Sequence, residues 1–222
     1  MLWVILSLGF LWCAWTELRT AIVAPAGYSW PRPLNKPALI VWLALAALCA
    51  WPPLQQWRLE RLLSSTATTL AEGRPAQVHC NSLFDTLFDT EMLAGGHADL
   101  DSGRIVLQPQ GCSALTAYLR HPERASLEEL WSLGLITHES MHVLGVRDEV
   151  LTECRAVQRN YRAAKLLGVP DAIAKKNALD YYREIYLARG TLGPMQSQYH
   201  SAECAPGKSL DERLADSAWA AL

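Results

Sequence analysis

THESMHVLGVRDEVLTECRAVQ, residues 137–158, holds two histidines four positions apart, with a glutamate directly after the first. Residues four apart on a helix lie on one face, one turn from each other, so His138 and His142 can reach a single ion. Glu139 points in a neighbouring direction, from which it can take a proton from a water at that ion. The stretch therefore predicts a catalytic metal site, with the two histidines as ligands and Glu139 as general base.

A third protein ligand is expected from the chain beyond Gly145. Glu153 lies in the next predicted helix, at about the same depth from the Gly145 turn as His142. Glu149 lies one turn earlier on the same face and is expected as a hydrogen-bonding partner of a ligating histidine. Asp148 is offered by the H-x-x-G-x-x-D spacing, but it also reads as a helix cap. We predict Glu153 as the ligand, with Asp148 and Glu149 left as alternatives.

The competing interpretation is a chance pattern, a solvated helix face that carries two histidines. The flanks of the motif favour a core helix instead, because apolar residues surround it on both sides. These are Leu133, Leu135 and Ile136 before the motif, and Val143 and Leu144 after it.

The stretch resembles the zincin metallopeptidases. HESMH followed by ECRA, residues 153–156, is similar to compact gluzincins, in which a glutamate of an E-x-x-A pattern on the following helix is the third ligand. The resemblance implies Zn²⁺ as cofactor and a peptide or protein as substrate. It implies His138, His142 and Glu153 as zinc ligands and Glu139 as the catalytic residue.

The resemblance covers only residues 135–158, a small part of the chain. The H-x-x-G-x-x-D reading is similar to the metzincins, but the setting of Met195 does not match their methionine turn. A membrane hairpin joined to a cysteine-stapled domain of this kind also resembles bacterial membrane proteins for which no substrate is implied.

Two uncharged apolar segments near the start of the chain, residues 1–15 and 37–51, predict a transmembrane hairpin. Each is slightly shorter than the roughly 20 residues that a span prefers, and flanking apolar and aromatic residues can extend both. Pro52-Pro53 is expected to close the second. A cleaved signal peptide is the alternative for the first, which lacks a basic start and a clear cleavage site. Tryptophans gather here as in interfacial belts: Trp12, Trp15, Trp30, Trp42, Trp51 and Trp57.

The loop between the two segments carries Arg19, Arg32 and Lys36 against Glu17 alone. Positive loops stay in the cytoplasm, which predicts that the rest of the chain lies outside. The net charge of -2 and the absence of a basic run exclude nucleic acid as an expected partner.

The cysteines agree with an oxidising compartment. Beyond the apolar segments, Cys80, Cys112, Cys154 and Cys204 are widely spaced, with no C-x-x-C pair. They predict two disulfides, and we favour Cys80–Cys112 and Cys154–Cys204 because each pair joins neighbouring segments. Four reduced thiols in a cytoplasmic domain are the alternative.

Helical spacing over residues 55–72 predicts a stalk, broken at Gly73. Strands are expected at 76–80 and 104–109, with a short helix and a glycine turn between them in 81–97. A capping box at Ser126 begins a helix that ends at Gly145, and further helices are expected from Asp148 to Gly168 and from Pro170 to Gly190, before an irregular tail.

The predicted fold is α+β, mainly α. Residues 1–54 form two transmembrane helices, 55–75 a stalk helix and linker, and 76–222 a small zincin-like domain with a short β-hairpin or sheet. The predicted function is that of a multi-pass membrane zinc metallopeptidase with its C-terminal domain extracytoplasmic. The alternative is a non-catalytic binding or structural module with a vestigial or structural metal site.

The sequence pattern does not identify the substrate or the oligomeric state. The strand at 104–108 is expected as an edge above the metal helix, where an extended peptide could pair. A transition-state donor is needed and none is assigned; the candidates are Tyr181, Tyr182, Tyr186, Tyr199 and His200. Other histidines are expected to be structural or exposed, namely His79, His97 and His121.

Overall fold

The structure is a computed structural model that describes residues 2–24, 27, 30–82, 85, 95–217 and 219. The chain divides into two compact units, an N-terminal unit, Met1–Arg58, and a C-terminal unit, Leu59–Leu222. The described residues are mainly helical with one three-stranded sheet, as the sequence predicts. The short helix expected within 81–97 falls largely outside the described residues.

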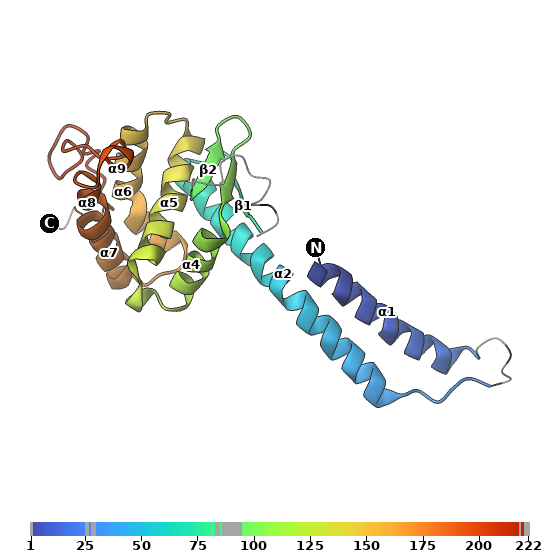
Figure 1. Ribbon diagram of the computed structural model, residues 1–222. Helices are drawn as coiled ribbons and strands as arrows, with labels where there is room; N and C mark the ends of the chain where they lie inside the picture. Colours follow the sequence, from blue (N-terminus) through green and yellow to red (C-terminus); the bar gives the residue numbers. More distant parts are fainter. Residues whose placement is uncertain are drawn as a thin grey trace. The chain divides into compact units, whose positions relative to one another are not determined.

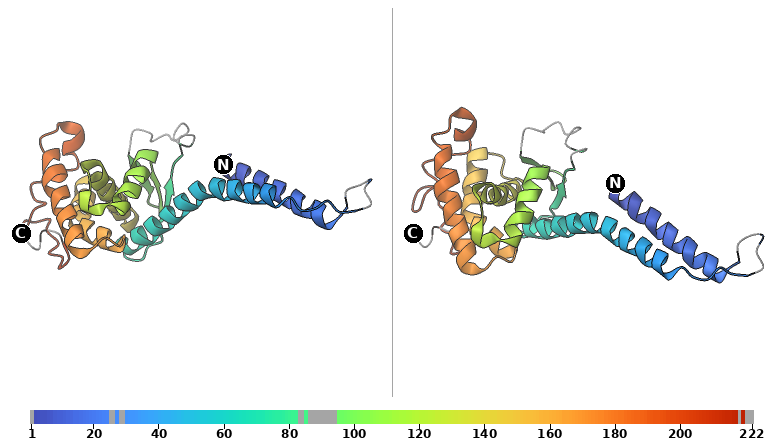
Figure 2. Two further views of the ribbon diagram at one scale, coloured as in Figure 1. Left: turned by 90° about the horizontal axis from the view of Figure 1, so that it is seen from below. Right: turned by 60° about the horizontal axis from the view of Figure 1, so that its bottom comes forward.

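The N-terminal unit consists of α1, Leu2–Ile22, and the part of α2, Lys36–Leu70, that precedes Leu59. The two helices lie alongside each other in both views of Figure 2. The Ser7 hydroxyl donates to the carbonyl oxygen of Ala46 (3.0 Å), and Phe10 stacks on Trp42. Both helices are long and apolar enough to cross a membrane.

α2 does not end at Pro52-Pro53, where the sequence predicted that the second apolar segment would close. A proline inside a helix removes one backbone hydrogen bond, but its fixed φ is itself helical. Beyond the prolines the helix is held by burial, since Leu63, Ala67 and Leu70 are fully buried in the core of the C-terminal unit. The segment expected as a stalk therefore contributes its last turns to that core.

The sheet has the strand order β1-β3-β2. β1, Gln77–Cys80, and β3, Arg104–Leu107, fall where strands were predicted and pair in parallel. β2, Gly96–Asp99, was not predicted and pairs antiparallel with β3. β3 is thus the central strand rather than the expected edge, and β2 is the edge strand among the described residues.

The helices of the C-terminal unit pack around α5, Leu127–Leu144, which is buried along most of its length (Figure 1). It contacts α4, Pro109–Arg120, on one side and α6, Glu149–Leu166, on another, while β2 lies along a further side. α4 follows β3 directly and has no predicted counterpart. α5 and α6 have the predicted boundaries, because their caps are encoded locally.

The third predicted helix begins as α7, Asp171–Asp180, with Pro170 at its cap position. It then passes through a π-helical segment, Tyr181–Tyr186 (η2), that the sequence did not predict, and ends as α8, Leu187–Arg189. A 3₁₀ turn, Pro122–Arg124, precedes α5, and a short helix, α9, Pro194–Ser197, lies in the otherwise irregular tail.

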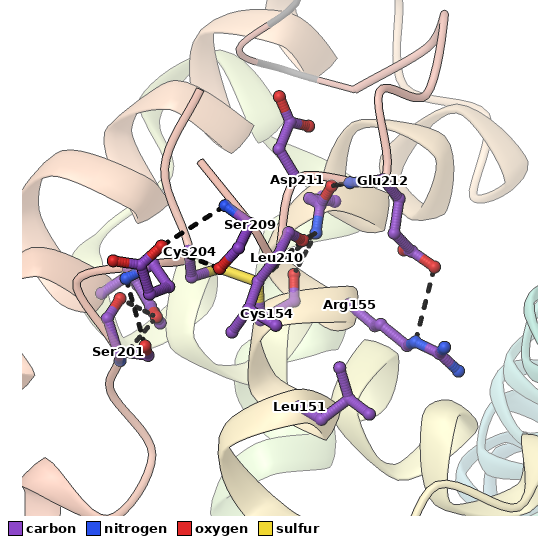
Figure 3. Close-up of a disulfide and its surroundings, with 12 residues drawn as sticks. Leu151, Cys154, Arg155, Ser201, Cys204, Ser209, Leu210, Asp211 and Glu212 are labelled. Carbon is purple, nitrogen blue, oxygen red and sulfur yellow. Dashed lines mark hydrogen bonds and ion pairs between the residues drawn. A yellow bond between two sulfur atoms is a disulfide. The ribbon is translucent and has the colours of Figure 1, made fainter. Parts of the chain in front are cut away.

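Both predicted disulfides are confirmed: Cys80 is bonded to Cys112, and Cys154 to Cys204. The first joins β1 to α4. The second joins α6 to the tail, as Figure 3 shows, beside the contact of Arg155 with Glu212. Cys13 and Cys49, in the N-terminal unit, are free thiols.

Candidate metal centre

The position of the α5 face that carries the two histidines depends on the two ends of the helix. At its start, Ser126 and Glu129 form the predicted capping box. At its end, Gly145 adopts a left-handed conformation with φ of 105°, which glycine tolerates and most other residues do not. The chain can therefore turn sharply, and α6 packs back along α5.

Both histidines are oriented by a hydrogen bond at Nδ1. The His142 Nδ1 donates to the carbonyl oxygen of Val146, immediately after the glycine turn (2.8 Å). The His138 Nδ1 donates to Oε2 of Glu153 (2.8 Å). These bonds turn the two Nε2 atoms toward each other, 3.1 Å apart. Nδ1 bonds of this kind fix the ring and leave the Nε2 lone pair for a metal.

A carboxylate oxygen completes this pair of nitrogens, and it belongs to Glu149. Its Oε2 lies 3.2 Å from Nε2 of His138 and 3.5 Å from Nε2 of His142. Zinc bonds of about 2.0–2.1 Å in a tetrahedron place the ligand atoms roughly 3.4 Å from one another. The three side chains have the donor types and the spacing of such a site, and they form a group that could hold a metal ion.

Glu153, the ligand predicted from the sequence, does not belong to this group. Its Oε2 is on Nδ1 of His138, the far side of the ring, and its Oε1 accepts from the Tyr181 hydroxyl (2.6 Å) and lies 3.1 Å from Nη1 of Arg189. The positions of the two glutamates are thus the reverse of those predicted: Glu149 lies with the candidate ligand atoms, and Glu153 bonds to the opposite nitrogen of His138.

The remaining alternative for the third ligand, Asp148, is the N-cap of α6, where its Oδ1 accepts from the backbone N–H of Leu151 (2.8 Å). This is the helix-cap role that the sequence also indicated. The cap holds the first turn of α6 in place, and Glu149 stands in that turn.

The electrostatics of the group favour a cation. Burial lowers the pKa of His138, but hydrogen bonds to Glu149 and Glu153 outweigh burial and raise it to about 10. The bond from His138 lowers the pKa of Glu149. Burial raises the pKa of Glu153, yet His138 and Arg189 bring it below its ordinary value. Two carboxylates therefore remain ionised around a ring that is positively charged without a metal.

Glu139 is 4% exposed and lies beside the group. A cavity of about 580 Å³ covers it together with the three candidate ligands, Tyr199 and all of β2. A second cavity of about 210 Å³ meets the first at His138, Glu139 and Tyr199 and extends along α5 toward Trp131 and Leu135. The predicted base therefore lines both cavities although it is largely buried.

Among the candidate donors, the structure brings only Tyr199 to the open side of the group. Its ring is 5.8 Å from the ring of His138, and the guanidinium of Arg189 lies 5.4 Å from its centroid. Burial raises the pKa of Tyr199, which keeps its hydroxyl protonated at neutral pH. Tyr181 contacts Glu153 instead, whereas Tyr186 bonds to the backbone of Ser201.

The other histidines are distributed as follows. His79 lies 3.3 Å from Glu60, His121 is exposed next to Glu123, and His200 packs on Tyr186. His97, on β2, lines the large cavity, which places it closer to the site than expected.

Arg189, which contacts Glu153, was not predicted from the sequence, because nothing in its local pattern separates it from a surface arginine.

The chain matches no protein-family model, no curated protein and no solved structure. Its function is therefore inferred from the chemistry of the site.

Proposed function

We propose that this chain is a membrane-anchored, zinc-dependent metallopeptidase. The observation that carries the proposal is the convergence of Nε2 of His138, Nε2 of His142 and Oε2 of Glu149, 3.1–3.5 Å from one another, with Glu139 beside them under an open cavity. The proposed ligand set is two histidines and Glu149. This revises the choice of Glu153 made from the sequence.

A zinc ion held there would polarise the scissile carbonyl and make a water more acidic. Glu139 accepts the proton of the attacking water and passes it to the leaving amine. Tyr199 donates a hydrogen bond to the oxygen that gains negative charge. Glu153 and Val146 hold Nδ1 of His138 and of His142, so both Nε2 atoms would be free to bind the ion.

The position of β2 supports a peptide as the substrate. Every residue of this edge strand lines the cavity that also contains the candidate ligands. An extended peptide can add to a sheet edge through main-chain hydrogen bonds. A peptide bound along β2 would pass over Glu139. We therefore propose β2, in place of the strand at 104–108 expected from the sequence, as the strand that pairs with the substrate.

The location of the enzyme follows from its two units. The N-terminal unit is proposed to anchor the chain as a transmembrane hairpin with its basic loop in the cytoplasm. The C-terminal unit is then extracytoplasmic, in agreement with its two disulfides.

A non-catalytic module with a structural metal is the competing function. Structural zinc sites are typically closed by four protein ligands. Here three candidate ligands lie under a cavity of about 580 Å³, and a buried acid stands next to one of them. These features favour catalysis over a structural role.

The test compares Glu139→Gln with the parent as full-length, detergent-solubilised protein. Zinc content is measured by mass spectrometry, and cleavage of a peptide library is measured with and without chelator. We expect Glu139→Gln to keep its zinc and to lose activity by about 100-fold or more, as for a general base. A chelator should abolish cleavage by the parent, and readded zinc should restore it. Equal cleavage by both proteins, or no zinc in either, would refute the proposal.

A further inference from the structure

We propose that Arg189 and Tyr181 are positioning residues of this metal centre, which clamp Glu153 so that it holds His138 in its ligating orientation. The inference rests on the proposed function for the identity of the metal. It goes beyond that function because neither residue lies among the candidate ligands, and both come from the helical segment after α6.

The two oxygens of the Glu153 carboxylate have different partners. One oxygen, Oε2, takes the hydrogen bond from Nδ1 of His138. The other, Oε1, takes the Tyr181 hydroxyl at 2.6 Å and lies 3.1 Å from Nη1 of Arg189. Arg189 also donates to the Tyr181 hydroxyl (3.3 Å). With Oε1 held from two directions, the carboxylate cannot rotate away from the histidine.

Burial makes the clamp necessary. Glu153 is 1% exposed, Tyr181 2% and Arg189 8%. A buried carboxylate without partners is strongly unfavourable and would be protonated or would withdraw from the core. A guanidinium and a phenol hydroxyl on Oε1 compensate its charge, so that Oε2 can serve His138 as an ionised acceptor.

The π-helical segment explains how both residues reach one carboxylate. Tyr181 and Arg189 are eight positions apart, and on a regular α-helix of 3.6 residues per turn their side chains would point about 80° apart. A π-helical turn contains about one residue more than an α-helical turn. Across it, eight positions make nearly two full turns, and the two side chains point in nearly the same direction. η2, Tyr181–Tyr186, begins at the first of the two residues and ends before Arg189, and both side chains contact Glu153.

The structure also offers matched controls inside the same segment. The hydroxyl of Tyr182 makes no hydrogen bond to the part of the chain that the structure describes, and its ring packs on Tyr186 and Trp219. Arg183 is exposed to solvent. Tyr182→Phe and Arg183→Lys therefore make the same chemical changes as Tyr181→Phe and Arg189→Lys, away from Glu153.

The experiment measures the zinc dissociation constant of full-length protein in detergent, by competition with a chromophoric chelator. We expect Tyr181→Phe and Arg189→Lys to bind zinc about 10–100-fold more weakly than the parent, the range typical of partners of a ligating histidine. Their cobalt-loaded forms should also show a changed visible spectrum, which reports the coordination geometry. Tyr182→Phe and Arg183→Lys should bind zinc as the parent does.

Zinc affinity within twofold of the parent in both Tyr181→Phe and Arg189→Lys would overturn the clamp. Thermal unfolding of the metal-free proteins checks that the variants are folded. If Arg189→Lys does not fold, the result of Tyr181→Phe decides, because this variant removes only one hydroxyl. His138→Ala separates this result from the proposed function. If His138→Ala binds zinc as tightly as the parent, the metal site itself is wrong and the clamp falls with it.

Discussion

At the scale of single residues, the site depends on which nitrogen of a histidine each carboxylate meets. Glu149 approaches His138 at Nε2, and Glu153 approaches the same ring at Nδ1. One imidazole can bind a metal through only one of these atoms in this geometry. Since Nε2 of His142 faces Nε2 of His138, the carboxylate on that side is the candidate ligand, and the other orients the ring.

Alanine variants of two acids, Glu149 and Asp148, distinguish a metal ligand from a helix cap. Glu149→Ala should lose bound zinc because it removes a ligand atom. Asp148→Ala should keep zinc and lower the free energy of unfolding by about 1 kcal/mol, the usual effect of losing an N-cap. Zinc content by mass spectrometry and urea unfolding measure the two effects. Zinc retained in Glu149→Ala but lost in Asp148→Ala would contradict this assignment.

Tyr199→Phe tests the proposed donor. The variant keeps the ring that packs against His138 and Arg189 and removes only the hydroxyl. We expect kcat to fall by about 100-fold, as for loss of one transition-state donor. KM and zinc affinity should stay close to those of the parent, because the hydroxyl is not a ligand. Unchanged kcat would exclude this hydroxyl from the reaction.

The sequence predicted the helix that carries Glu139 and the proximity of His138 and His142, because spacing along a single helix sets which residues share a face. It did not predict which of Glu149 and Glu153 lies beside the Nε2 atoms of the two histidines. These two residues also share a face, and depth along the helices is similar for several pairs of positions. The choice depends on how closely α5 and α6 approach each other at the turn, which is a tertiary property.

At the scale of helices and strands, α5 is adapted to its neighbours at Gly134. A Cβ added there would overlap the ring of Tyr181. Alanine normally favours a helix over glycine by about 1 kcal/mol, but overpacking of a core costs roughly 1–3 kcal/mol. Gly134 therefore lets the π-helical segment approach α5 closely, and from this position Tyr181 reaches Glu153.

Gly134→Ala should consequently destabilise the protein and weaken zinc binding, since Tyr181 must move. Gly111, in α4, is the matched control, because a Cβ there would meet its nearest neighbours only at 4.0 Å. We expect Gly111→Ala to be neutral or stabilising. Urea unfolding and the chelator competition assay measure both variants. A Gly134→Ala protein that is more stable than the parent would show that the Tyr181 ring has room to shift.

The predicted elements were correct where local chemistry sets them, and wrong or absent where it does not. The capping box at Ser126 and the cap at Asp148 fix the starts of α5 and α6 from within a few residues. β2 is made of Gly, His, Ala and Asp, residues that do not favour strands, so pairing with β3 determines it. The π-helical segment likewise has no local signature, and its three tyrosines are all buried in the folded unit.

At the scale of the whole molecule, the Cys154–Cys204 disulfide fixes the tail to the helix that carries Glu149. The tail also bonds to α6 through Gln158, which donates to the Leu210 carbonyl oxygen and accepts from the Glu212 N–H (Figure 3 shows the surroundings). A cross-link that closes a loop of 50 residues is worth roughly 4 kcal/mol by the chain-entropy estimate.

The double variant Cys154→Ala/Cys204→Ala should lower the free energy of unfolding by a large part of that amount. Because the tail carries Tyr199, kcat should fall more than zinc affinity does. Urea unfolding of the metal-free protein and the two functional assays measure these effects. An unchanged unfolding midpoint would mean that the hydrogen bonds of Gln158 hold the tail without the disulfide.

The boundary between the two units differs from the boundary that the sequence predicts. The sequence distinguishes the two apolar helices of the N-terminal unit from the rest of the chain, because their composition differs. It places a stalk where the structure has Leu63, Ala67 and Leu70 in the core, because helical spacing does not reveal what a helix packs against. The last turns of α2 thus belong to the C-terminal unit, and a fragment that lacks them would lose part of its core.

The proposed topology can be tested with a membrane-impermeant maleimide on intact cells. Cys13→Ser and Cys49→Ser remove the free thiols, and single cysteines are then placed at Pro33, in the basic loop, or at Lys208, in the tail, both exposed. We expect Lys208→Cys to be labelled and Pro33→Cys to be labelled only after the cells are opened, because positive loops remain in the cytoplasm. The reverse pattern would contradict the proposed orientation of the hairpin. It would place the C-terminal unit in a reducing compartment, where its two disulfides would not persist.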